Sequence, residues 1–152
     1  MSTSILDRLQ ADMTAAMKSK DADTLSTLRM LKAAIMEAKT KKPKDAALTA
    51  EEEIEILQRY VKKRRETIDE LKRVGRTETL SREEQEIEVT QRYLPQLISE
   101  AELKTVIRDA IAKTGAATAK DMGKVIGVVM GQVKGRAEGG TVSRLVKEAL
   151  SG

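Results

Sequence analysis

The sequence predicts an all-α protein, and three observations support this fold class. Apolar residues repeat at helical spacing along almost the whole chain, and no segment alternates with period two for long enough to form a strand. With no Phe, no Trp and only two Tyr, the core must be aliphatic, which suits packing between helices. The 34% of charged residues fits exposed helix faces that carry opposite charges.

Four helices are expected in an N-terminal domain formed by residues 1–95. Ser2 or Ser4 can cap the first helix, and Asp21 or Asp23 can cap the second. The segment Lys39–Lys44 contains Pro43 and four lysines that repel one another, so it is expected to be a basic loop.

The sequences Thr49-Ala50-Glu51-Glu52 and Ser81-Arg82-Glu83-Glu84 resemble capping boxes that open the third and fourth helices. Gly75 is a natural end for the third helix. Because a residue before proline avoids the helical conformation, Tyr93-Leu94-Pro95 is expected to end the domain.

A small three-helix domain is expected in residues 96–152. Ser99-Glu100-Ala101-Glu102 begins its first helix as a further capping box, and Gly115 ends that helix. Thr118 can cap the next helix, which Gly135 stops, and the last helix starts near Thr141. A unit of this size is marginal alone, so it leans on the first domain or on a partner.

The composition excludes several kinds of chemistry. The chain has no Cys and no His, so it cannot form a disulfide, a thiolate or imidazole zinc site, or a nucleophile activated by histidine. No catalytic residue, metal site or cofactor-binding residue is expected. The chain starts without an apolar leader and has no run of ~20 apolar residues, so we expect no membrane contact and a cytoplasmic protein.

A first group of candidate binding residues lies on the third predicted helix. Lys62, Arg65, Lys72 and Arg76 fall in one stripe, which Lys63 and Arg64 thicken. Point charges in a row can meet the phosphates of a nucleic acid. The same side chains also fit a solvated face on which they pair with neighbouring acids.

Three glycines at intervals of four residues, Gly123, Gly127 and Gly131, stand inside a predicted helix. Each glycine costs the helix roughly 1 kcal/mol relative to Ala, so the missing side chains are expected to bring a compensating advantage at these positions. Either a neighbouring helix of this chain packs closely on this ridge, or a phosphate backbone approaches it beside Lys124. The run Lys134-Gly135-Arg136 then places two cations on a glycine-rich turn, where an anion can bind.

Several strings together resemble one family along nearly the whole chain. They are Leu28-Arg29-Met30-Leu31-Lys32-Ala33-Ala34-Ile35, Val61-Lys62-Lys63-Arg64-Arg65, Gly75-Arg76, Glu86-Ile87, Tyr93-Leu94-Pro95, Asp121-Met122-Gly123-Lys124-Val125 and Lys134-Gly135-Arg136-Ala137. The chain resembles the free-standing YqeY type of the GatB/YqeY family, and it is similar to the C-terminal tail of the tRNA-dependent amidotransferase B subunit.

The resemblance implies an accessory protein that binds tRNA, with a YqeY-like domain at residues 1–95 and a GatB-tail-like domain at residues 96–152. It also implies association with a carbon–nitrogen ligase that uses glutamine as amide donor, and an amidotransferase or aminoacyl-tRNA synthetase as possible partner. The expected nucleic-acid-binding residues are Lys62, Arg64, Arg65, Arg76, Lys124, Lys134 and Arg136. The alternative is a protein–protein adaptor that docks such a subunit without RNA.

Overall fold

The computed structural model describes residues 3–151, and all regular structure within them is helical. This confirms the predicted fold class. The helices of this part of the chain are α1 (Ile5–Lys18), α2 (Ala22–Thr40), α3 (Ala50–Arg73), α4 (Leu80–Gln91), α5 (Glu100–Thr114), the 3₁₀ turn η1 (Ala119–Asp121), α6 (Met122–Val133) and α7 (Gly139–Ser151).

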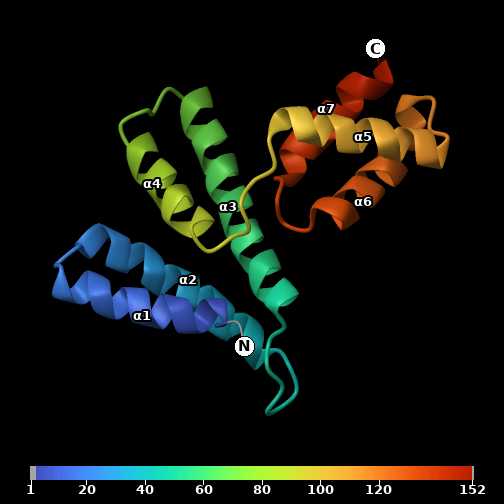
Figure 1. Ribbon diagram of the computed structural model, residues 1–152. Coiled ribbons are helices and arrows are strands. Elements are labelled where there is room, and N and C mark those ends of the chain that lie inside the picture. Colours follow the sequence, from blue (N-terminus) through green and yellow to red (C-terminus); the bar gives the residue numbers. More distant parts are fainter. Residues whose placement is uncertain (1–2, 152) are drawn as a thin grey trace. The chain divides into compact units, whose positions relative to one another are not determined.

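The described residues form two compact units, which we call unit 1 and unit 2. Unit 1 ends at Leu94 and unit 2 begins at Pro95. In unit 1, α1 and α2 form an antiparallel hairpin, and α3 and α4 form a second one (Figure 1). In unit 2, the three helices α5, α6 and α7 all pack against one another. Whether the units are independent domains stays a prediction.

Each unit buries its own aliphatic core. Leu9, Leu28, Leu31, Ile35 and Leu57 are fully buried in the core of unit 1. The core of unit 2 is formed by the residues that face inward from its helices: Leu103, Ile107, Ala110, Val125, Val129, Val133, Ala137, Val142, Leu145 and Val146.

Most of the expected helix caps are present. Ser4 accepts a hydrogen bond from the N–H of Asp7, and Asp21 accepts one from Thr24. Thr49 and Glu52 form a complete capping box, and Ser99 accepts a hydrogen bond from Glu102. Ser2, the alternative cap of α1, lies outside the described residues.

Two expected boundaries were wrong. α4 begins at Leu80, so Ser81 lies inside the helix and caps nothing, and its N-cap Thr79 makes no side-chain cap. α2 continues to Thr40, so the loop expected from Lys39 begins only after that residue.

The expected starts in unit 2 are close to those in the structure. Thr118 caps the helical segment as expected, but its first turn is the 3₁₀ turn η1, which leads directly into α6. α7 begins at Gly139, two residues before Thr141.

A buried carboxylate that we had not expected caps α1 from another helix. Glu53 of α3 is 5% exposed and accepts hydrogen bonds from the backbone N–H groups of Ile5 and Leu6, at 3.3 and 3.0 Å. The first N–H groups of a helix have no partner within it, and a carboxylate also complements the helix dipole. Glu53 therefore ties the start of α1 to α3.

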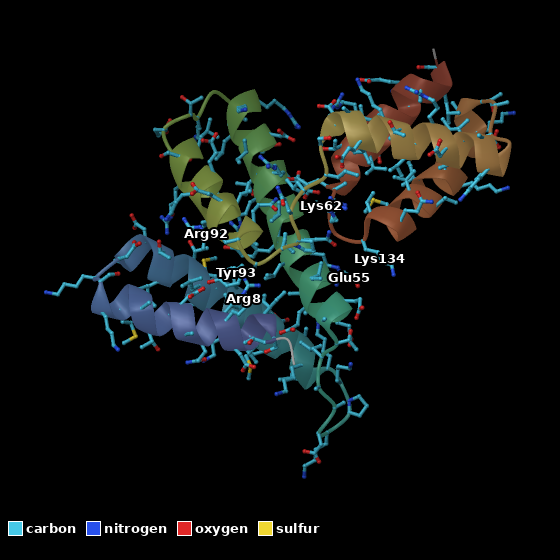
Figure 2. The ribbon with its side chains drawn as sticks, in the orientation of Figure 1. Arg8, Glu55, Lys62, Arg92, Tyr93 and Lys134 are labelled. Carbon is cyan, nitrogen blue, oxygen red and sulfur yellow. The ribbon has the colours of Figure 1, made fainter. Side chains whose placement is uncertain are left out.

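The end of unit 1 is held by Tyr93. Its hydroxyl donates a hydrogen bond to the Asp12 carboxylate of α1, and the Arg8 guanidinium lies 5.0 Å from its ring centre. Arg8 also donates a hydrogen bond to the carbonyl oxygen of Arg92, and Figure 2 shows these side chains together at the end of α4. Burial raises the pKa of Tyr93, and the Asp12 carboxylate raises it further, so the phenol stays protonated.

Candidate nucleic-acid interface

The glycines of α6 form a bare ridge on the outside of unit 2. Val125, Val129 and Val133 cover the inner face of the helix. Gly123, Gly127 and Gly131 lie on the exposed face, and a Cβ atom built on any of them would meet nothing within 4 Å. Within unit 2, no described helix therefore packs closely on this ridge.

Cations stand at both ends of this ridge. Lys120 of η1 and Lys124 of α6 lie at one end, and Lys134 caps the other. All three are exposed, and none forms an ion pair with a described residue. α6 itself contains no acidic residue. At 1.5 Å per residue, α6 is about 18 Å long, so the cations lie towards the two ends of an otherwise uncharged surface of that length.

The turn after α6 places Lys134 in a conformation that is unusual for its residue type. Lys134 has a φ of 35°, and its N–H donates a hydrogen bond to the carbonyl oxygen of Met130 at 3.1 Å. Gly135 follows with a φ of 85° and is buried. A non-glycine residue in the left-handed region costs roughly 1–2 kcal/mol, so the turn carries backbone strain at Lys134, as it does at Lys20 and Asp45 elsewhere in the described residues.

Arg136 has a structural role in the same turn. Its Nε donates a hydrogen bond to the carbonyl oxygen of Gln96 at 3.2 Å, and its own carbonyl oxygen accepts one from the N–H of Ile98 at 2.7 Å. These bonds join the turn to the segment that enters α5. The side chain of Arg136 is nevertheless exposed.

Several acids of unit 2 are used within the unit. Glu100 and Glu148 both pair with Arg144, at 2.8 and 3.2 Å. The hydrogen bond from Arg144 lowers the pKa of Glu100. Asp121 accepts hydrogen bonds from the N–H groups of Ala117 and Thr118, which lower its pKa. These acids are thus engaged mainly by groups other than the lysines beside the α6 ridge, and Lys124 is attracted to the Asp121 carboxylate without forming an ion pair with it.

The structure leaves Arg64 only partly exposed, with its guanidinium in contact with neighbouring side chains. Its guanidinium lies 4.8 Å from the ring centre of Tyr60, 3.4 Å from Glu83 and 3.7 Å from Glu86. Its side chain is only 22% exposed. A guanidinium that is stacked and shared between two carboxylates is a poor phosphate ligand, so we leave Arg64 out of the candidate interface.

The other cations expected on α3 do not form one continuous row. Lys62 is exposed and projects from the helix with Glu55 (Figure 2), but ion pairs Arg59–Glu55 and Arg73–Glu70 interrupt the face. Arg65 is also exposed. Arg76 lies beyond the helix, because α3 ends at Arg73 and Gly75, with a φ of 75°, turns the chain.

The sequence reasoning missed Lys120 as a candidate. Its spacing of four residues from Lys124 was the available signal, since such residues share a helix face. Among residues 3–151 no group of acidic side chains is placed to hold a metal ion, and no helix there is long and apolar enough to cross a membrane.

The fold and these surfaces define an all-helical protein of two compact units with a cation-framed glycine ridge. The sequence model of the Yqey-like protein family matches residues 6–150. The chain therefore belongs to the YqeY-like family. It is also similar to Altered inheritance of mitochondria protein 41, mitochondrial, from Pyrenophora tritici-repentis (strain Pt-1C-BFP). The two are 32% identical over 112 residues, which is 70% of this chain but only 59% of the length of that relative.

Proposed function

We propose that this protein is an accessory tRNA-binding protein related to the tRNA-dependent amidotransferases. One observation carries the proposal: the exposed ridge of α6 has cations at both ends, has no acid within the helix and is not covered by the described residues of unit 2. A sugar–phosphate backbone can approach a bare glycine surface closely, and lysines can then neutralise its phosphates. Unit 2 has no aromatic residue for stacking on bases, which favours contacts to the backbone.

The salt dependence of tRNA binding tests this proposal. Affinity should fall with salt, with a log–log slope of roughly 0.7–0.9 per phosphate neutralised. The double variant Lys124→Ala/Lys134→Ala is expected to bind more weakly and to reduce this slope by about 1.4–1.8. Fluorescence anisotropy with labelled total tRNA over a salt series measures both quantities.

The matched control is Lys104→Ala/Lys147→Ala, which removes the same charge from α5 and α7 in unit 2. Lys134 is preferred to Arg136 for the test, because the hydrogen bonds of Arg136 also hold the turn. If both double variants lower affinity equally, binding reflects net charge alone and the assigned interface is wrong. Absence of tRNA binding at low salt refutes the function itself.

The open ridge also favours a second candidate function, a protein–protein adaptor. A helix of a synthetase or amidotransferase subunit can pack closely on small residues. Capture of partners from cell extract with and without nuclease separates the two functions, because an adaptor keeps its partner after RNA is removed. The glutamine-dependent ligase activity and the cytoplasmic location implied above stay predictions, and release of ammonia from glutamine by the purified chain would establish the former.

A further inference from the structure

Unit 1 contains a polar cavity that the proposed function does not use. It lies between the first turns of α2 and α4, two helices that pack together, and has a volume of about 530 Å³. Its lining residues all have polar or charged side chains: Asp23, Ser26 and Thr27 from α2, and Ser81, Arg82, Gln85 and Glu86 from α4. Small-molecule sites have such volumes, and convergent polar groups orient the ligand in them.

Opposite charges line this cavity without pairing. Asp23 comes from α2 and Arg82 from α4, and neither forms an ion pair with any described residue. A carboxylate and a guanidinium that can reach each other normally form a hydrogen-bonded pair. Here each charge remains available on its own helix, so the cavity offers one cationic and one anionic group to the same occupant.

A third charge reinforces the anionic side. Glu86 is 6% exposed, and its Oε2 atom is buried without a hydrogen-bond partner. Its ion pair is to Arg64, with 3.7 Å between Oε2 and Nε. A buried carboxylate oxygen that accepts no hydrogen bond is costly. Because the Oε2 atom is inaccessible, Glu86 acts on an occupant of the cavity through its charge and not through a hydrogen bond to this atom.

We propose that this cavity binds a small zwitterion of the α-amino acid class. Its carboxylate pairs with Arg82, and its ammonium group lies between Asp23 and Glu86. The hydroxyl groups of Ser26 and Ser81 and the amide of Gln85 then face the rest of the ligand, which favours a short polar side chain. Apolar or aromatic ligands are disfavoured, because no apolar side chain lines the cavity.

Two-dimensional amide NMR of the full-length protein tests this assignment. Pools of the twenty common amino acids are added first, and the members of an active pool are then added singly. The expected result is a saturable shift of the signals of Asp23, Thr27, Arg82 and Gln85. Removal of either ligand charge, in the N-acetylated and the carboxamide forms, is expected to weaken binding at least about tenfold, since charged hydrogen bonds contribute that much.

Two variants complete the test. Arg82→Gln is expected to remove the preference for the free carboxylate over the carboxamide, and Asp23→Asn to weaken the preference for the free amine. Both positions are exposed, so the variants keep the fold, and Arg29→Gln on the same helix as Asp23 is the matched control. The proposal is overturned if no pool shifts these signals, if blocked analogues bind equally well, or if Arg82→Gln leaves discrimination unchanged.

Discussion

Glu86 is a buried carboxylate whose ionisation opposes folding. Burial raises its pKa above 4.5, the attraction of Arg64 lowers it, and repulsion from Glu83 adds to the rise. The native state therefore holds the proton of Glu86 more tightly than the unfolded chain does. Stability must then fall as the pH rises through the raised pKa, and the penalty persists at neutral pH.

We accordingly expect Glu86→Gln to raise the free energy of unfolding at neutral pH, because glutamine resembles the protonated carboxyl group. The gain should shrink as the pH falls towards 4.5. Urea unfolding followed by far-UV circular dichroism over this range measures it. The measurements stop at pH 4.5, because acids with lowered pKa values, such as Asp21 and Glu52, lose their stabilising effect at lower pH.

Glu88→Gln is the control for this experiment, since Glu88 is an exposed carboxylate paired with Arg92 on the same helix. It should show no gain that grows with pH. A difference between Glu86→Gln and the parent protein that stays constant with pH contradicts the assigned cause.

Arg64 shows how far single residues could be assigned from sequence. The run of cations around it suggested an exposed cluster, yet Arg64 lies seven residues after Leu57 and so shares the inward face of α3. The helical periodicity therefore predicts that Arg64 faces inward, whereas the run of cations suggested that it is exposed. The identity of its partners, Glu83 and Glu86, depends on how α4 packs on α3 and is not encoded locally.

The helices themselves were predictable because each cap and each apolar stripe is a local signal. The exception at α4 has a physical cause. Leu80 packs against the core cluster of Val61, Ile68 and Ile87, which draws it into the first turn of the helix. Full burial of a leucine side chain contributes ~2 kcal/mol, so even the partial burial of Leu80 is comparable with the ~1 kcal/mol of a serine cap, and packing overrides the capping sequence.

The glycine ridge gives a prediction for a whole helix. Replacing Gly123, Gly127 and Gly131 together with Ala should stabilise α6 by roughly 0.5–1 kcal/mol per position, because alanine restricts the unfolded chain and meets no neighbour here. Urea unfolding measures the gain. If the ridge is a contact surface, the same variant should lose tRNA or partner binding despite its higher stability.

Gly115→Ala is the matched control for the ridge. That position is equally open, but its φ of 69° belongs to the left-handed region, so alanine is expected to destabilise by roughly 1 kcal/mol or more. If the triple ridge variant proves no more stable than the parent protein, the three added methyl groups meet an obstacle and the ridge is not open.

At the scale of the molecule, the sequence could indicate two helical regions but not the features that depend on long-range packing. The Glu53 cap of α1, the Tyr93 contacts and the polar cavity all join segments that are far apart in the chain. No periodicity or local motif predicts contacts between such distant segments. Whether the two units also unfold separately is a further property that neither pattern nor compactness decides.

The tyrosines provide a reporter for that question, because Tyr60 and Tyr93 both lie in unit 1 and no other aromatic residue exists. Tyrosine fluorescence therefore follows unit 1, whereas far-UV circular dichroism follows both units. We expect the triple ridge variant to move the circular dichroism transition to higher urea while its tyrosine transition overlays that of the parent protein.

A conservative substitution in unit 1 provides the converse test of whether the two units unfold separately. Ile35 is fully buried, and Ile35→Val should cost about 0.5–1.5 kcal/mol and move the tyrosine transition to lower urea. The part of the circular dichroism transition that comes from unit 2 should then occur at the same urea concentration as in the parent protein. If each variant instead moves both signals together, the two units unfold as one cooperative structure, and substitutions in one unit must then be expected to alter the stability of the other.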